Sequence, residues 1–243
     1  MNDGDAIRIP YERTRDLLAA LEALPDGILD LDGERERIRW RHDDGARLDV
    51  ALPWTFPPLG APPTLHAYLN GVLDFPPATL VLLIQAGHAA LGLSEAGELL
   101  EHKVIRKYMT RRKQGKAQIT HLKTKGKSRL GSRIRLQQSV EFVEEINRRG
   151  GEWIEDHPVE RILVSCSETL WGLLFQSRVP APFERRDPRL RFLPVHVHTP
   201  NMAELERIIA LSLDGEVRVS GSLPDDIRHR FPELSPGRPR SPR

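Results

Sequence analysis

Cysteine is nearly absent from this chain of 243 residues, in which Cys166 is the single example. One thiol excludes an internal disulfide framework and a cysteine-rich metal cluster, and it indicates a reducing compartment such as the cytosol. Cys166 ends an apolar stretch, so we expect it to be a core residue.

Long apolar runs are missing as well. The most apolar stretch, residues 80–84, is followed at once by Gln85 and is far too short to cross a bilayer. It is therefore predicted to be a buried strand. The chain opens on Met1, Asn2 and Asp3, a polar start that does not resemble a signal peptide. We expect a cytoplasmic protein with no membrane association.

Lysine is missing from most of the chain, because all seven lysines lie between Lys103 and Lys127. Residues 102–135, which we call the basic segment, hold these seven lysines and six arginines with no acidic residue, a formal charge of +13. The other 23 arginines and 34 acidic residues leave the rest of the chain at −11, so the formal net charge of +2 hides the asymmetry. A solvated surface would mix both signs. A block of one sign predicts an anionic partner, and we predict that the basic segment binds nucleic acid.

The first 78 residues are predicted to form a small α+β extension. Four leucines recur with a helical period and predict a helix over 11–24. Short strands are predicted at 28–31, 37–40 and 47–52. Residues 53–63 are proline-rich, and we expect this connector to pack on the core.

Residues 79–220 are predicted to form an α/β domain with a mixed sheet, because strands alternate with helices. Strands are expected at 79–85, 88–93, 102–109, 161–166, 192–197 and 216–219. Helices are expected from about 132 to Gly150-Gly151, at 168–175 with Ser167 as the cap, and at 201–213. Residues 111–127 lack an apolar period and are expected to form a long, mobile, exposed loop. Residues 221–243 are expected to be a flexible, basic, proline-rich tail.

The densest part of the basic segment runs from Arg106 to Gln118. Its cations can neutralise phosphates and release counterions, which gives affinity without sequence choice. Further cations follow it along the chain. We expect RNA to be bound by Arg106, Tyr108, Arg111, Arg112, Lys113, Lys116, Lys123, Lys125, Lys127, Arg129 and Arg133.

Three uncharged residues in the same stretch suit chemistry on a nucleic acid. Tyr108 can stack on a base or brace a phosphate. Gly115 lets the backbone approach a ligand closely. The side-chain amide of Gln118 both donates and accepts hydrogen bonds, so it can orient a water or a substrate without removing its proton.

Residues 108–118 read Tyr-x-x-Arg-Arg-Lys-Gln-Gly-x-x-Gln, which resembles the signature of the Vms-like release factors. These proteins act in ribosome-associated quality control and are related to the catalytic middle domain of archaeal and eukaryotic peptide-chain release factors. The resemblance covers roughly residues 79–213. It implies a ribonuclease-H-like α/β core, with the N-terminal extension outside it.

The resemblance also implies a catalytic tip made of Gly115, Ala117 and Gln118, whose glutamine enters the peptidyl-transferase centre. Lys116 and Ala117 stand where the release factors have two glycines. Ala117 keeps its position small, whereas Lys116 places a cation beside the reactive ester. The implied function is hydrolysis of peptidyl-tRNA on an obstructed large ribosomal subunit. We expect these two partners, a monomeric protein and no cofactor.

Two other functions stay open at this point. A tRNA endonuclease that cuts near the 3′ CCA end needs the same docking surface but breaks a phosphodiester. A ribosome-binding or RNA-binding module needs only the cations. His196 and His198 alternate along a predicted strand, but no third ligand lies nearby in the sequence, so we expect no metal site.

Overall fold

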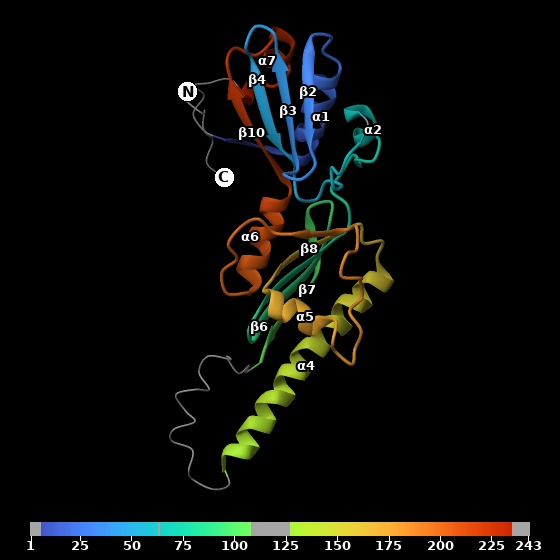
Figure 1. The fold of residues 1–243 in the computed structure, drawn as a ribbon, viewed down its shortest axis with the longest axis vertical. Helices are drawn as coiled ribbons and strands as arrows, with labels where there is room; N and C mark the ends of the chain where they lie inside the picture. The colour runs from blue at the N-terminus through green and yellow to red at the C-terminus, as the bar shows by residue number, and fades with distance from the viewer. Residues whose placement is uncertain (1–5, 63, 108–126, 235–243) are drawn as a thin grey trace. The chain divides into compact units, whose positions relative to one another are not determined.

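The computed structural model describes residues 6–62, 64–107 and 127–234, with the backbone alone for 127–136. They form two units that we describe separately. The first unit consists of Met1–Pro76 and Ala210–Arg243, and the second of Pro77–Ile209 (Figure 1). Each unit has its own five-stranded sheet and its own hydrophobic core.

The sheet of the first unit is antiparallel throughout, with the strand order β1-β10-β4-β3-β2. Its strands are β1 (Ile7–Pro10), β2 (Gly27–Asp32), β3 (Arg37–His42), β4 (Arg47–Ala51) and β10 (Asp214–Ser220). Apolar and charged residues alternate along β3, β4 and β10, so one face is buried and the other is charged. The three strands predicted within the first 78 residues are confirmed.

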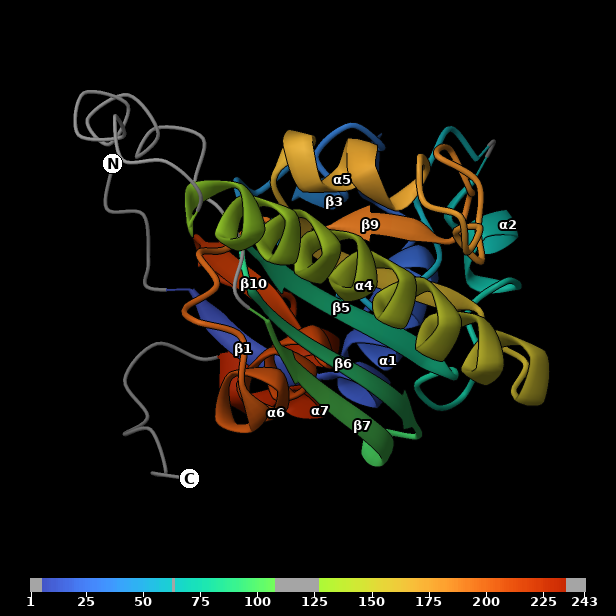
Figure 2. The same ribbon diagram turned by 90° about the horizontal axis from the view of Figure 1, so that it is seen from below.

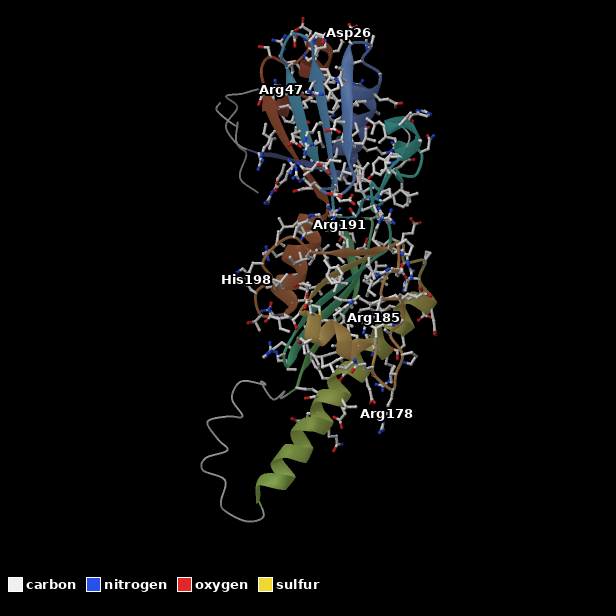
Figure 3. The ribbon with its side chains drawn as sticks, viewed as in Figure 1. Asp26, Arg47, Arg178, Arg185, Arg191 and His198 are labelled. Atoms are coloured by element: carbon white, nitrogen blue, oxygen red, sulfur yellow. The ribbon has the colours of Figure 1, made fainter. Side chains whose placement is uncertain are left out.

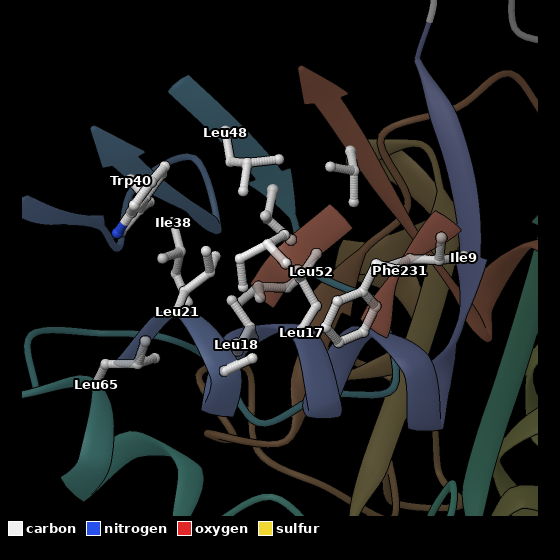
Figure 4. Packing of buried hydrophobic residues seen from close by; sticks show 14 of the residues in the cluster. Ile9, Leu17, Leu18, Leu21, Ile38, Trp40, Leu48, Leu52, Leu65 and Phe231 are labelled. Carbon is white, nitrogen blue, oxygen red and sulfur yellow. The ribbon is translucent and has the colours of Figure 1, made fainter. Parts of the chain in front are cut away.

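Helix α1 (Tyr11–Glu22) covers the apolar face of this sheet, as predicted from its leucine spacing. Leu17, Leu18 and Leu21 point from it into the core (Figure 4). The proline-rich connector packs on the same core, because Phe56 is buried with its ring centroid 4.6 Å from that of Tyr11. A short helix, α2 (Leu65–Leu69), follows the connector and was not predicted.

The C-terminal part of the first unit differs from the expected boundaries. Strand β10 lies between β1 and β4, so it belongs to the N-terminal sheet rather than to the second domain. Helix α7 (Asp225–Arg230) and the 3-10 turn η2 (Pro232–Leu234) then place Ile227, Phe231 and Leu234 in the first core. The expectation of a flexible tail from residue 221 is therefore wrong for 221–234, while 235–243 lie outside the described residues.

Replacing Phe231 with alanine should lower the free energy of unfolding by about 3 kcal/mol, because a fully buried aromatic ring leaves a cavity. The ring is 1% exposed and lies under the guanidinium of Arg13, 4.5 Å away. Chemical denaturation measures the change, and Arg228→Ala on the exposed side of α7 is the control, expected within about 0.5 kcal/mol of wild type. Equal stability of Phe231→Ala and wild type would contradict this packing.

The second unit contains a mixed sheet in the order β7-β6-β5-β8-β9. Its strands are β5 (Thr79–Gln85), β6 (His88–Glu95), β7 (Glu98–Arg106), β8 (Arg161–Cys166) and β9 (Leu190–Phe192). The first three are antiparallel neighbours, and β8 and β9 add parallel strands beside β5. This arrangement confirms the mixed α/β core and agrees with the ribonuclease-H-like topology that the resemblance implied.

Helices cover both faces of the second sheet (Figure 2). Helix α4 (Lys127–Asp156) places Phe142 against Leu91 and Leu93, and α5 (Glu168–Leu174) packs beside it. On the opposite face Gly92 meets α6 (Met202–Ser212), where a Cβ atom would lie 2.9 Å from Leu205. The central strand β5 is buried along nearly its whole length because both of its faces are covered, which explains its continuous apolar run.

The predicted end of α4 at Gly150-Gly151 is wrong, since the helix continues to Asp156. A Cβ atom on Gly150 would lie only 3.4 Å from Pro182, so this glycine serves close packing instead of helix termination. The last turns also bury Trp153, whose indole nitrogen donates a hydrogen bond of 2.7 Å to Glu101. That burial stabilises the extra turns.

The predicted strand at 192–197 is also wrong, because β9 ends at Phe192. Side chains take up the carbonyl groups beyond it. Gln85 donates to the carbonyl oxygens of Val197 and His198 at 2.9 and 3.1 Å, and Arg207 donates to that of His196 at 3.1 Å. These bonds hold the chain as a loop instead of a strand.

Candidate nucleic-acid interface

The basic segment starts on β7 and ends within the first turns of α4. Arg106 is the last residue of β7, is exposed, and pairs in register with His88. Lys127, Arg129 and Arg133 lie on the first two turns of α4, of which the backbone alone is described. The other predicted residues lie outside the described residues, namely Tyr108, Arg111, Arg112, Lys113, Gly115, Lys116, Ala117, Gln118, Lys123 and Lys125.

Helix α4 carries the end of the basic segment away from the sheet. Lys107, next to the end of β7, contacts Glu141 of the helix, 14 residues after the helix begins at Lys127. At 1.5 Å per residue, these turns extend about 21 Å beyond that contact. Figure 1 shows the helix continuing past the end of the sheet. The predicted cations on α4 therefore lie on a projecting arm.

Four charged side chains hold the base of this arm, and we call them the Lys107 clamp. The ammonium group of Lys107 lies 3.3 Å from the carboxylate of Glu141 and 3.5 Å from that of Glu145, and Lys103 lies 3.8 Å from Glu145. A hydrogen bond from Gln137, followed by one from Lys107, lowers the pKa of the Glu141 carboxyl. The backbone nitrogen of Lys107 also donates to the carbonyl of Gly87 at 3.0 Å.

The clamp divides the thirteen cations of the basic segment into two groups. Lys103 and Lys107 are neutralised by α4, so their charge holds β7 against the helix and is not offered to phosphates. Each such half-exposed pair contributes little alone, but four groups in one network fix the start of the segment more firmly. Sequence analysis missed this division, although Glu141 and Glu145 are spaced one helical turn apart.

Cys166 ends β8 and packs against the second core, as expected. Burial raises the pKa of its thiol to about 12. The group therefore stays a neutral thiol at physiological pH, which does not suit a nucleophile or a metal ligand.

His196 and His198 lie together, with ring centroids 5.2 Å apart, although no strand aligns them. Their neighbour Glu204 is 6% exposed in its side chain and receives hydrogen bonds from Arg207 at 2.6 and 2.9 Å and from the backbone of His198 at 2.7 Å. Within 6–62, 64–107 and 127–234, no group of three histidine, cysteine or acidic residues could hold a metal ion. The cluster ties a loop to α6.

The hydrogen bonds from Arg207, followed by those from His198, lower the pKa of the Glu204 carboxyl to about 2. The folded pKa is thus below the ordinary value of 4.5, so the stabilisation is present above pH 4.5 and is lost as the pH falls towards 2. Glu204→Gln should therefore cost on the order of 2 kcal/mol at pH 7. Denaturation curves should show the difference from wild type shrinking below about pH 4. A constant difference down to pH 2 would contradict the assignment, and Glu206→Gln is the exposed control.

Residues 79–218, more than half of the chain, match the protein family described as "Bacteroidetes VLRF1 release factor". The chain belongs to this release factor family. The matched range includes the whole basic segment, and the resemblance to Vms-like release factors is confirmed.

Curated relatives of the family share about a quarter of their residues with this chain. The protein named "tRNA endonuclease ANKZF1" is 28% identical over 134 residues in Bos taurus and in Homo sapiens, covering 54% of this chain and 18% of each relative. The Mus musculus protein of the same name is 27% identical over 164 residues, covering 66% of this chain and 21% of the relative. The chain thus spans about a fifth of the length of these relatives.

A solved structure named "Vms1 mitochondrial localization core" aligns with 88% of this chain and 85% of its own, with a TM-score of 0.46 and 13% sequence identity. At that TM-score we draw no argument from it. Among the described residues, no helix combines the length and the apolar character needed to span a membrane.

Proposed function

We propose that this protein is a ribosome-associated release factor that hydrolyses peptidyl-tRNA on stalled large ribosomal subunits. The observation that carries the proposal is the motif at 108–118, which ends on Gln118 within the family match. We expect the protein to act as a monomer in the cytoplasm.

The proposed reaction is the attack of water on the ester that joins the nascent peptide to the terminal ribose of the tRNA. The water oxygen bonds to the carbonyl carbon, the ester bond to the ribose oxygen breaks, and that oxygen takes up a proton. Gln118 orients the water or the ribose hydroxyl through its amide. Backbone amides of Ala117 and Gln118 stabilise the negative charge that develops on the carbonyl oxygen.

Docking is proposed to rest on the cations of the basic segment beyond the Lys107 clamp. The clamp fixes the segment at one end, and α4 carries its other end about 21 Å past the clamp. An arm anchored in this way brings a chemical group to a distant site without exposing the sheet that supports it. The peptidyl-transferase centre supplies much of the remaining environment, so the free protein needs no complete active site.

The second candidate is a tRNA endonuclease, and the names of the curated relatives favour it. It uses the same docking surface but breaks a phosphodiester near the 3′ end of the tRNA. Lys116 in place of a glycine suits this reaction too, because a cation beside a phosphate stabilises the charge of the transition state.

One experiment separates these functions. The full chain is incubated with large subunits that carry a defined peptidyl-tRNA, and both the peptide and the tRNA 3′ end are analysed. Free peptide with an intact CCA end supports ester hydrolysis. A shortened tRNA supports the endonuclease and overturns the primary proposal. Stable binding without release of peptide or tRNA overturns both and leaves an RNA-binding module.

A further inference from the structure

The sheet of the first unit has one apolar face and one charged face. Helices α1 and α7 pack on the apolar face. No described helix of this unit packs on the charged face, which we call the open face. Its residues fall into rows, because antiparallel register places one residue of each strand beside its neighbour and on the same side.

Two of these rows alternate in charge. One row reads Asp30, Arg39, Asp49, Arg218 across β2, β3, β4 and β10. The next reads Asp32, Arg37, Ala51, Glu216, Arg8 and extends to β1. Each row therefore alternates acidic and basic side chains across the sheet, with Ala51 as the single neutral member.

The alternation produces ion pairs between the rows and along them. Arg39 lies 3.1 Å from Asp30 and 3.0 Å from Asp32, which occupy neighbouring positions on β2. Arg37 lies 2.7 Å from Asp49. Arg8 lies 3.5 Å from Glu216. This part of the open face satisfies its own charges.

The third row breaks the pattern. It reads Ile28, Arg41, Arg47, Ser220, so two arginines stand directly opposite each other on β3 and β4. Both are exposed, and no described carboxylate lies within 4 Å of either guanidinium. Like charges placed directly opposite destabilise a sheet. Ile28 beside them is 56% exposed, which is also unfavourable for an isolated surface.

Arg218 on β10 extends this charge diagonally from Arg47. It is exposed, and its neighbour in register, Asp49, is already held by Arg37. The turn after β3 offers no compensation from Asp44, because its carboxylate accepts a hydrogen bond from the nitrogen of Ala46 at 2.9 Å and lies 2.9 Å from the ring of His42. Arg41, Arg47 and Arg218 form the arginine corner. Figure 3 labels Arg47 on β4.

We infer that the arginine corner binds the phosphate backbone of folded RNA, as a second contact separate from the basic segment. Three adjacent strands about 4.8 Å apart present the three guanidinium groups, so neighbouring groups can grip one phosphate or two successive ones. A guanidinium matches two phosphate oxygens at once. The three rows contain no aromatic residue, so bases have nothing to stack on and the contact is made to the backbone.

This inference needs an RNA partner, which the release factor family supplies, but it does not need peptidyl-tRNA hydrolysis. Its partner is recognised by phosphate spacing instead of sequence. The chain would then hold folded RNA through both units, one contact through the basic segment and one through the arginine corner.

The test compares full-length wild type with the double variant Arg41→Gln, Arg47→Gln in binding to large ribosomal subunits over 50 to 200 mM salt, salt concentrations over which phosphate contacts dominate affinity changes. Each lost phosphate contact should reduce the slope of log affinity against log salt by about 0.7 to 0.9. The variant should thus lose about 1.5 from the slope, and binding should weaken roughly tenfold or more at low salt. Its melting temperature should equal or exceed that of wild type, because a repulsive pair has been removed.

The matched control is Arg8→Gln, Arg35→Gln, which removes two exposed arginines from the same unit. The control should keep the wild-type slope. An unchanged slope in the Arg41 and Arg47 variant overturns the inference, and so does an equal loss in the control, because the effect would then follow net charge alone.

Hydroxyl-radical footprinting of the ribosomal RNA identifies the partner. A group of nucleotides should lose protection with the Arg41 and Arg47 variant and keep it with the control. Weaker binding without any change in the footprint would assign the corner to an acidic ribosomal protein and overturn the RNA contact. Peptide release at saturating protein should stay at the wild-type rate, so a failure of this inference is distinct from a failure of the proposed function.

Discussion

Gln118→Ala is expected to slow peptide release from stalled large subunits by about 100- to 1000-fold, which is the usual effect of removing one preorganised polar group from an acyl-transfer site. Binding to the subunit should stay nearly intact, because cations elsewhere in the basic segment supply the affinity. Release is measured in single turnover with saturating protein, and binding by sedimentation of the same complexes. The free energy of unfolding should also barely change, since Gln118 is expected in an exposed loop and outside both cores.

Gln114→Ala is the matched control, because it removes the same side chain four residues earlier in the motif. We expect a milder loss of rate. If Gln118→Ala releases peptide at the wild-type rate, the assignment of the tip is wrong. The protein would then dock without chemistry or use other groups such as Tyr108 or Arg112.

The second large effect is expected from reversing the charge of Arg111, Arg112 and Lys113 together to glutamate. This variant should lose measurable binding to large subunits. Thirteen cations lie in the basic segment, and even six phosphate contacts would change the affinity roughly a thousandfold between 50 and 200 mM salt. A salt titration of the wild type should therefore be steep, and a flat one would disprove RNA binding by this segment.

Arg148, Arg178 and Arg186 provide the control for charge reversal, since all three are exposed in the same unit and outside the basic segment. Their triple glutamate variant has the same net charge as the first one. It should bind large subunits within a few-fold of wild type. Similar losses in both variants would mean that overall charge, and not the basic segment, determines binding.

Regular elements with a clear period were predictable from the sequence. The leucines of α1 and the apolar run of β5 each belong to one element, and their burial follows from local spacing. Ser167 was predicted as a helix cap and does accept a hydrogen bond from the nitrogen of Leu170, at 3.4 Å. In these cases the information needed lies within a few residues of the element.

Features that depend on distant partners were not predictable in this way. Gly150 ends a helix in most local contexts, but here Pro182, 32 positions further along, takes the space that a side chain would need. Ile227 and Phe231 lie in a short, charged stretch whose apolar residues gain meaning only from the sheet formed by the first 51 residues. The partner strands of β10 were hidden for the same reason.

The candidate site shows the same division. The motif at 108–118 is local, so the order of its residues is enough to indicate the family. The Lys107 clamp joins residues 34 and 38 positions apart, and a count of charges along the chain treats Lys107 as one more free cation. The arginine corner depends on strand register, which sets Arg41 beside Arg47 across a turn and Arg218 from the far end of the chain.

The return of β10 to the centre of the first sheet has a consequence for synthesis of the protein itself. A chain made from its N-terminus reaches residue 209 with the second unit complete, while the first sheet still lacks the strand between β1 and β4. Domains usually fold in the order in which they emerge. Here the unit that begins first must finish last, and until Asp214–Ser220 leaves the exit tunnel, β1 has no neighbour and β4 keeps a bare edge. A ribosome that stalls late on this message would thus hold a nascent chain with a folded second unit and an unfinished first one.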